Sequence, residues 1–126
     1  MLHHLSFAVA DLNRAAAFYD AALGALGYVR VWTAQDAVGY GTPGGGDRFA
    51  IKASSGQVAA PSQGCHIAFA AASRDAVDAW YAAAIRHGAK DNGAPGLRPH
   101  YGLHYYAAFV VDLDGYRIEA VISEPA

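Results

Sequence analysis

The stretch HLSFAVADLNRAAAFY, residues 4–19, decides the fold, because a related stretch, HIAFAAASRDAVDAWY, follows at residues 66–81. A histidine, a phenylalanine, a residue able to cap a helix and an aromatic pair recur at one offset of 62 positions, from 4 to 66 and from 19 to 81. The matched positions are His4 and His66, Phe7 and Phe69, Asp11 and Ser73, and Phe18-Tyr19 and Trp80-Tyr81. Several side-chain chemistries recurring at a single spacing indicate an internal repeat.

Each copy starts with a strand pattern and continues with a helical one. Leu5, Phe7 and Val9 alternate with small or polar residues, which predicts a strand with one buried face. Asp11 can then cap a helix, as Ser73 can in the second copy. Apolar residues at steps of three and four predict one buried helical face in each copy; they are Leu12, Ala16, Tyr19, Leu23 and Leu26, then Val77, Trp80, Ala84 and Ile85.

Further strand patterns follow each helix, at 28–33, 38–40 and 48–53 and then at 105–111 and 116–122. Asp114-Gly115 between the last two predicts a hairpin turn. We therefore predict an α+β fold of two repeated βαβββ modules, forming a curved mixed sheet shaped as a cup with the helices on its outer face. Residues 1–126 would be a single domain, with module one at about 1–57, a linker at 58–63 and module two at 64–124.

Composition and charge limit the kinds of partner that the protein is expected to bind. Hydrophobic residues make up 54% of the 126 residues, and the formal net charge is −2 without a basic run, which argues against nucleic acid as a partner. No apolar run is long enough to span a membrane, and no leader pattern precedes the first strand. The single cysteine favours a reducing compartment, so we expect a cytoplasmic protein that binds a small molecule. The low charge and high apolar content make a homodimer the expected assembly.

The face opposite the buried positions of the strands contains two histidines and a carboxylate. His4 and His66 take equivalent places in the repeat, and Glu119 alternates with apolar neighbours in the last strand. A carboxylate on so apolar a strand needs either solvent or a cation to hold it. A register shift of one residue would put His3 in the place of His4.

Three segments carry a resemblance to the vicinal-oxygen-chelate superfamily, which includes glyoxalase I, bleomycin-resistance proteins, extradiol dioxygenases and fosfomycin-resistance enzymes. They are HHLSFAVADLNRAAAFYDAALGALGY at the start, GCHIAFAAASRDAVDAWYAAA in the middle and YYAAFVVDLDGYRIEAV near the end. The resemblance implies a cup around a divalent ion (Zn, Ni, Mn or Fe) with His4, His66 and Glu119 as ligands. A fourth ligand would fall within residues 48–53, where no Glu, Gln or His occurs, so the sequence departs there from the glyoxalase I pattern.

A second group of polar and aromatic residues surrounds the long loop of the second half. His100, Tyr101 and Tyr105 are candidates for proton transfer. Trp32, Arg98, His104 and Tyr106 are candidates for substrate contact, although core or edge packing is an equally ordinary role for the aromatic ones.

Three functions are compatible with these features. The first is a metal-dependent enzyme that chelates a substrate through adjacent oxygens, of lyase, isomerase, transferase or dioxygenase type. The second is a metal-free binding or drug-sequestering protein that uses the same cup. The third is a scaffold with a vestigial site.

Overall fold

Each half of the chain folds as a strand, a helix and further strands around its own sheet. The computed structural model describes residues 1–126. In the first module the elements are β1 (Leu5–Val9), α1 (Leu12–Ala25), β2 (Val29–Thr33), β3 (Ala37–Gly41) and β4 (Phe49–Ala53). In the second they are β5 (Ile67–Ala70), α2 (Arg74–Arg86), β6 (Lys90–Asp91), β7 (Gly96–Leu97), β8 (Tyr106–Val111) and β9 (Arg117–Ile122). The predicted α+β class is confirmed.

The strands are divided between two mixed sheets. The first has the order β1-β4-β3-β2 and the second β5-β9-β8-β6, with β7 also paired to β8. In both sheets the first strand of the module runs parallel to the last, and the other pairs are antiparallel. The short strands β6 and β7 lie between the second helix and residue 105, where the sequence predicts a long loop and no strand. The outer edges of β1 and β5 have no neighbouring strand.

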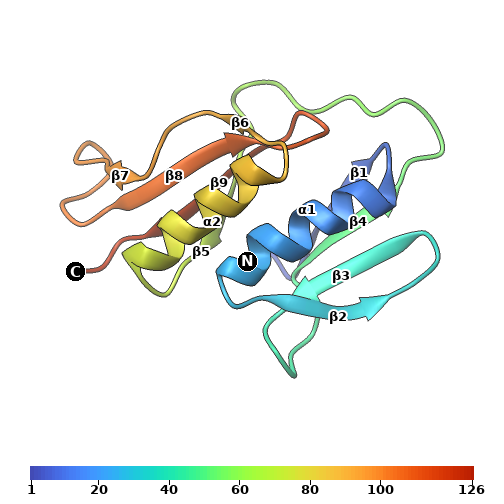
Figure 1. Ribbon diagram of the computed structural model, residues 1–126, viewed down its shortest axis with the longest axis horizontal. Helices are drawn as coiled ribbons and strands as arrows, with labels where there is room; N and C mark the ends of the chain where they lie inside the picture. Colours follow the sequence, from blue (N-terminus) through green and yellow to red (C-terminus); the bar gives the residue numbers. More distant parts are fainter.

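The helices begin and end where the sequence predicts. Asp11 accepts a hydrogen bond from the Arg14 amide, and Ser73 accepts one from the Ala76 amide, so each caps its helix. Gly27, with φ of +86°, follows the end of α1 in a conformation that L side chains rarely adopt. The two helices lie side by side on the same side of the two sheets (Figure 1). Neither is long and apolar enough to cross a membrane.

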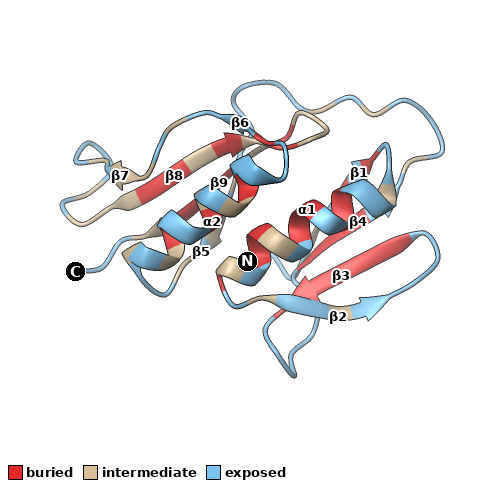
Figure 2. Ribbon diagram, viewed as in Figure 1, coloured by how far each residue is buried: buried red, intermediate tan, exposed pale blue.

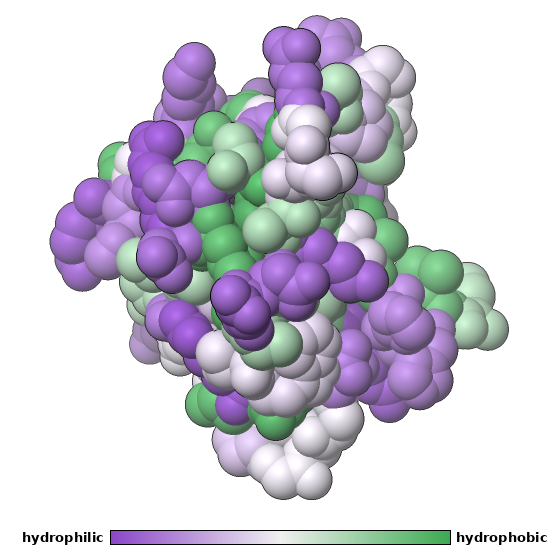
Figure 3. Space-filling model, turned by 90° about the vertical axis from the view of Figure 1, so that its right-hand side faces the viewer, coloured by the Kyte–Doolittle hydropathy of each residue, from purple (hydrophilic) through white to green (hydrophobic).

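One apolar core extends across both modules. Phe7 of β1 stacks on Tyr116 with ring centroids 3.9 Å apart, and Phe49 of β4 meets Phe69 of β5 edge to face at 5.2 Å. Strand β3 is buried along its whole length, whereas the neighbouring edge strand β2 is largely exposed (Figure 2). On the face shown in Figure 3, apolar and polar residues are interspersed.

Hydrogen bonds from tyrosines also join the modules. The Tyr28 hydroxyl donates to the carbonyl oxygen of Ala70 in β5 at 2.6 Å. The Tyr116 hydroxyl donates to the carbonyl oxygen of Ala8 in β1 at 2.7 Å. Ala8 and Ala70 are equivalent positions of the repeat, so each module stabilises the same point on the other's exposed strand edge.

The predicted hairpin turn is built around a buried carboxylate. Asp112 Oδ1 accepts hydrogen bonds from the amides of Asp114 and Tyr116, both at 2.9 Å, and Oδ2 accepts one from the Tyr19 hydroxyl of α1. Gly115 provides the positive φ of +93° that the turn requires. Burial raises the pKa of the Asp112 carboxyl above its ordinary value, although the three donors act in the opposite direction.

Candidate functional site

The centre of the candidate site is a contact between a half-exposed histidine and a buried glutamate. His66 Nε2 lies 3.0 Å from Glu119 Oε1, and the two side chains are 52% and 1% exposed. The other carboxylate oxygen, Oε2, accepts a hydrogen bond from the Tyr105 hydroxyl at 2.5 Å. Both oxygens of the buried carboxylate therefore have a polar partner, as a buried charge requires.

Strand register explains how Glu119 reaches this position. In β9 it pairs with Ala68 of β5 on one side and with Phe109 of β8 on the other. Its neighbours Ile118 and Ala120 are buried on the helix side of the sheet, so Glu119 points to the opposite face. His66 immediately precedes β5 and reaches the same face, which we call the cup face.

Tyr105 is a hydrogen-bond donor and not a base under ordinary conditions. Burial, the hydrogen bond to Glu119 and the charge of that carboxylate raise the pKa of Tyr105 to about 12. Near neutral pH the phenol therefore keeps its proton. Its role in the site is to hold one oxygen of Glu119.

The two modules place different residues at the position of the carboxylate. Ser6 pairs with Ala50 in the first sheet, as Ala68 pairs with Glu119 in the second, and Ser6 and Ala68 are equivalent in the repeat. Ala50 is thus the counterpart of Glu119. A methyl group occupies the place where a fourth ligand would lie, in agreement with the absence of a donor side chain noted in residues 48–53.

The structure does not bring His4 to this pair within one chain. Its Nδ1 atom lies 2.9 Å from Nδ1 of His3, and no three His, Cys, Asp or Glu side chains gather closely enough to hold a metal ion. The strands that carry or follow these histidines, β1 and β5, belong to separate sheets and are not paired with each other. Within one chain His66 and Glu119 give two donors, fewer than the three protein ligands usual for a catalytic metal.

Several of the predicted loop residues do surround the pair. The Arg98 guanidinium lies 5.3 Å from the ring centroid of Phe109, the residue opposite Glu119, and its Nη2 donates to the Ala94 carbonyl oxygen at 2.8 Å. The rings of His100 and Tyr101 lie 4.1 Å apart, and Tyr101 meets Tyr105 at 5.3 Å. The predicted proton-transfer residues thus form a series of adjacent rings from the exposed loop to Glu119.

Comparison with known proteins defines the family. The model of the Glyoxalase/Bleomycin resistance protein/Dioxygenase superfamily matches residues 1–120. The protein is a member of this superfamily. The crystal structure of a glyoxalase/bleomycin resistance protein from Albidiferax ferrireducens T118 is 34% identical, with a TM-score of 0.81 over 96% of this chain and 97% of that chain.

Two further solved structures share the fold of this superfamily member. A glyoxalase-related enzyme from Fulvimarina pelagi is 17% identical, with a TM-score of 0.72 over 96% of this chain and 86% of that one. A glyoxalase/bleomycin resistance protein/dioxygenase family enzyme from Burkholderia phytofirmans PsJN is 18% identical, with a TM-score of 0.70 over 97% and 98%. At these identities the likeness concerns the fold alone. The comparison with curated proteins gives no match.

The remaining predicted contact residues of this superfamily member lie in different places. Trp32 lies over Gly39 on the cup face of the first sheet, because a bulge between Arg30 and Trp32 shifts the register of β2. Tyr106 points to the helix side, where its hydroxyl donates to Asp78 at 2.6 Å and Arg74 lies over its ring. Tyr106 therefore does not face the pair. His104 is half-buried and has no hydrogen-bond partner.

Sequence reasoning missed two features of this superfamily member's cup face. Phe109 lies opposite Glu119 and beneath Arg98, and Ala50 is the specific residue of the 48–53 stretch that takes the place of Glu119 in the first sheet. Both follow from the pairing register, which the 62-residue offset alone does not supply. The available signal for Phe109 was the alternation of side chains along residues 107–111. It separates the two faces of this strand, but only the pairing of Phe109 with Glu119 shows which of them is the cup face.

Proposed function

We propose that this superfamily member is a metal-dependent enzyme whose site combines His66 and Glu119 of one chain with His4 of a second copy. The contact between His66 Nε2 and Glu119 Oε1 carries the proposal. It puts an imidazole nitrogen and a carboxylate oxygen, both common metal-binding atoms, side by side on the cup face. His4 has the equivalent place in the first module, and it has no neighbouring donors other than His3. A homodimer would supply the third ligand from the partner's first module.

Two imidazoles and one carboxylate suit Fe, Zn, Ni or Mn and leave further positions open. When bound, such an ion supplies Lewis-acid stabilisation of two adjacent oxygens on a small substrate. This chain's residues would orient that substrate. Tyr105 holds Oε2 of Glu119, Arg98 offers a cation above Phe109, and His100 and Tyr101 lie along the path to solvent. Lyase, isomerase, transferase and dioxygenase chemistry are all compatible with this arrangement. The cytoplasmic location expected from the sequence stays a prediction.

Metal content tests the ligand set. Protein purified without chelator and then reconstituted with each of the four metals should bind an ion, and His66→Ala should lose it. His87→Ala is the matched control, since His87 is the exposed C-cap residue of α2. Equal metal content in wild type and His66→Ala would overturn the proposal.

A mixing experiment tests whether the site is shared between copies. His4→Ala and His66→Ala should each bind no metal alone. In a mixed dimer one site would lose both histidines and the other would keep all three ligands. Refolding the two variants together should therefore restore about a quarter of the wild-type metal content. A site within one chain would give no recovery.

A metal-free binding protein is the second candidate. It is favoured by the observation that Glu119 already has both oxygens occupied, by His66 and Tyr105. In that case aromatic ligands should quench the fluorescence of Trp32 equally with and without EDTA. A Trp32→Phe variant separates this signal from that of buried Trp80. The third candidate, a vestigial scaffold, predicts neither metal nor ligand binding.

A further inference from the structure

A second cavity lies apart from the His66–Glu119 pair. It occupies about 390 Å³ between the exposed edges of β1 and β5 and the end of α1. His3 and His4 line it, whereas His66 and Glu119 do not. Ten of its 15 lining residues are hydrophobic, among them Leu23, Phe49, Ile67 and Phe69. This volume lies near the lower end of the range for small-molecule sites, of roughly 300–1,000 Å³.

The cavity contains one permanent positive charge and no negative one. Arg48 lines it, and no aspartate or glutamate does, although acidic residues outnumber Lys and Arg in the chain. Arg48 has no carboxylate partner, since the ion pairs of the structure are Arg30–Asp20 and His66–Glu119. The only hydrogen bond of its side chain is a long one, from Nη1 to the His3 carbonyl oxygen at 3.4 Å.

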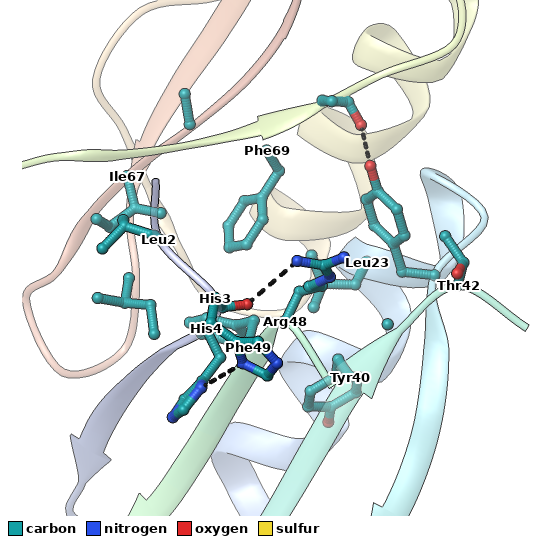
Figure 4. Close-up of a pocket in the computed structure, with 15 residues that line it drawn as sticks. Leu2, His3, His4, Leu23, Tyr40, Thr42, Arg48, Phe49, Ile67 and Phe69 are labelled. Atoms are coloured by element: carbon teal, nitrogen blue, oxygen red, sulfur yellow. Dashed lines mark hydrogen bonds between the residues drawn. The ribbon is translucent and has the colours of Figure 1, made fainter. Parts of the chain in front are cut away.

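The orientation of Arg48 directs this charge into the cavity. Figure 4 shows its guanidinium between Phe69, Leu23 and the backbone of His3. A guanidinium has five N–H donors and matches the geometry of a carboxylate. Arg48 is an exposed residue, and most of these donors have no partner within the chain.

The edge of β5 adds backbone donors to the same space. The Ala71 amide donates to Val121 of β9, so by strand alternation the amides of Ala68 and Ala70 point to the opposite, unpaired edge. The carbonyl of Ala70 on that edge is already bonded to Tyr28. Ala68 and Ala70 both line the cavity.

We propose that this cavity binds a small amphipathic monocarboxylate, with its carboxylate on Arg48 and its apolar body against Leu23, Ile67 and Phe69. A ligand of on the order of ten non-hydrogen atoms fits a site of this size. The ligand's charge is recognised by the guanidinium and the β5 edge, and its body is recognised by burial of apolar surface. His4 also lines the cavity, so this site shares one residue with the proposed metal site, but the argument for it rests on Arg48 and the apolar lining and not on a bound metal.

The test uses octanoate as the probe and 1-octanol as its uncharged match, titrated into the full chain by calorimetry. Octanoate should bind, and Arg48→Gln should weaken its binding by about tenfold or more, since hydrogen bonds to charged groups are strong. Arg86→Gln is the matched control, because Arg86 is exposed in the last turn of α2 and does not line the cavity. Octanol should bind more weakly than octanoate and should not respond to Arg48→Gln.

Three results would overturn the proposal: no octanoate binding, equal binding by wild type and Arg48→Gln, or loss of binding in His66→Ala, which would put the probe in the cup. Amide chemical shifts of Ala68 and Ala70 should move on addition of octanoate and stay in place in Arg48→Gln. Metal content of Arg48→Gln should equal that of wild type, so failure of this site and failure of the metal site are distinguishable.

Discussion

The Tyr28 hydroxyl donates to the Ala70 carbonyl oxygen at 2.6 Å, and this bond crosses from one module to the other. Tyr116 makes the reciprocal bond to Ala8. Tyr28→Phe and Tyr116→Phe should each lower the free energy of unfolding by about 1 kcal/mol, because each removes one hydrogen bond and keeps the ring. Urea denaturation measures the change. Tyr81→Phe, which loses an exposed bond to Asp91, is the control and should have a smaller effect.

Asp112 should be the most sensitive carboxylate for stability. Asp112→Ala leaves the amides of Asp114 and Tyr116 and the hydroxyl of Tyr19 without their acceptor, so it should cost about 2–3 kcal/mol. Asp112→Asn keeps the shape and an acceptor oxygen, and should cost less. Asp36→Ala, at an exposed position, should change the unfolding midpoint little. A midpoint for Asp112→Ala equal to that of wild type would contradict the role of this carboxylate.

The difference in unfolding free energy between wild type and Asp112→Asn should depend on pH, because the pKa of Asp112 is raised in the folded protein. Because the folded-state pKa lies above the ordinary value of 3.8, the stabilising contribution of the protonated group is complete below pH 3.8 and declines as the pH rises through the folded-state pKa. Asp112→Asn lacks this titration. Its stability relative to wild type should therefore improve from about pH 3 to about pH 7. A pH-independent difference in unfolding free energy would show that Asp112 titrates normally.

Trp32 and Gly39 should be energetically coupled. A Cβ atom at Gly39 would lie 2.3 Å from the indole of Trp32, so Gly39→Ala should displace the ring and cost about 1–3 kcal/mol. In a Trp32→Ala background the same change should be neutral or stabilising, because alanine suits a strand better than glycine. A double-mutant cycle by denaturation measures the coupling, and additive effects would contradict the overlay of the ring on Gly39.

Tyr105→Phe should affect stability through Glu119. The variant leaves Oε2 of a carboxylate that is 1% exposed without its donor, which should cost about 1–3 kcal/mol. In a Glu119→Gln background the cost should be smaller, since a neutral amide tolerates burial better. Thermal unfolding of the four proteins gives the answer. Equal costs in both backgrounds would mean that Tyr105 acts only through packing.

Local features of the fold were predictable and long-range ones were not. The offset between His4 and His66 gave both first strands and both helices, because capping and alternation are short-range signals. The bulge at Trp32 and the pairing of Ala50 with Ser6 depend on which strands become neighbours. The position of His4 depends on how two modules pack, and no spacing in the chain encodes that contact. Glu119 was correctly marked as needing a partner, but the partners in the structure are His66 and Tyr105.

Ala50 has the same place in the pairing register of the first sheet that Glu119 has in the second. To give this scaffold a second acidic ligand, Ala50 is therefore the residue to exchange, and the new side chain would face the cup side of the first sheet.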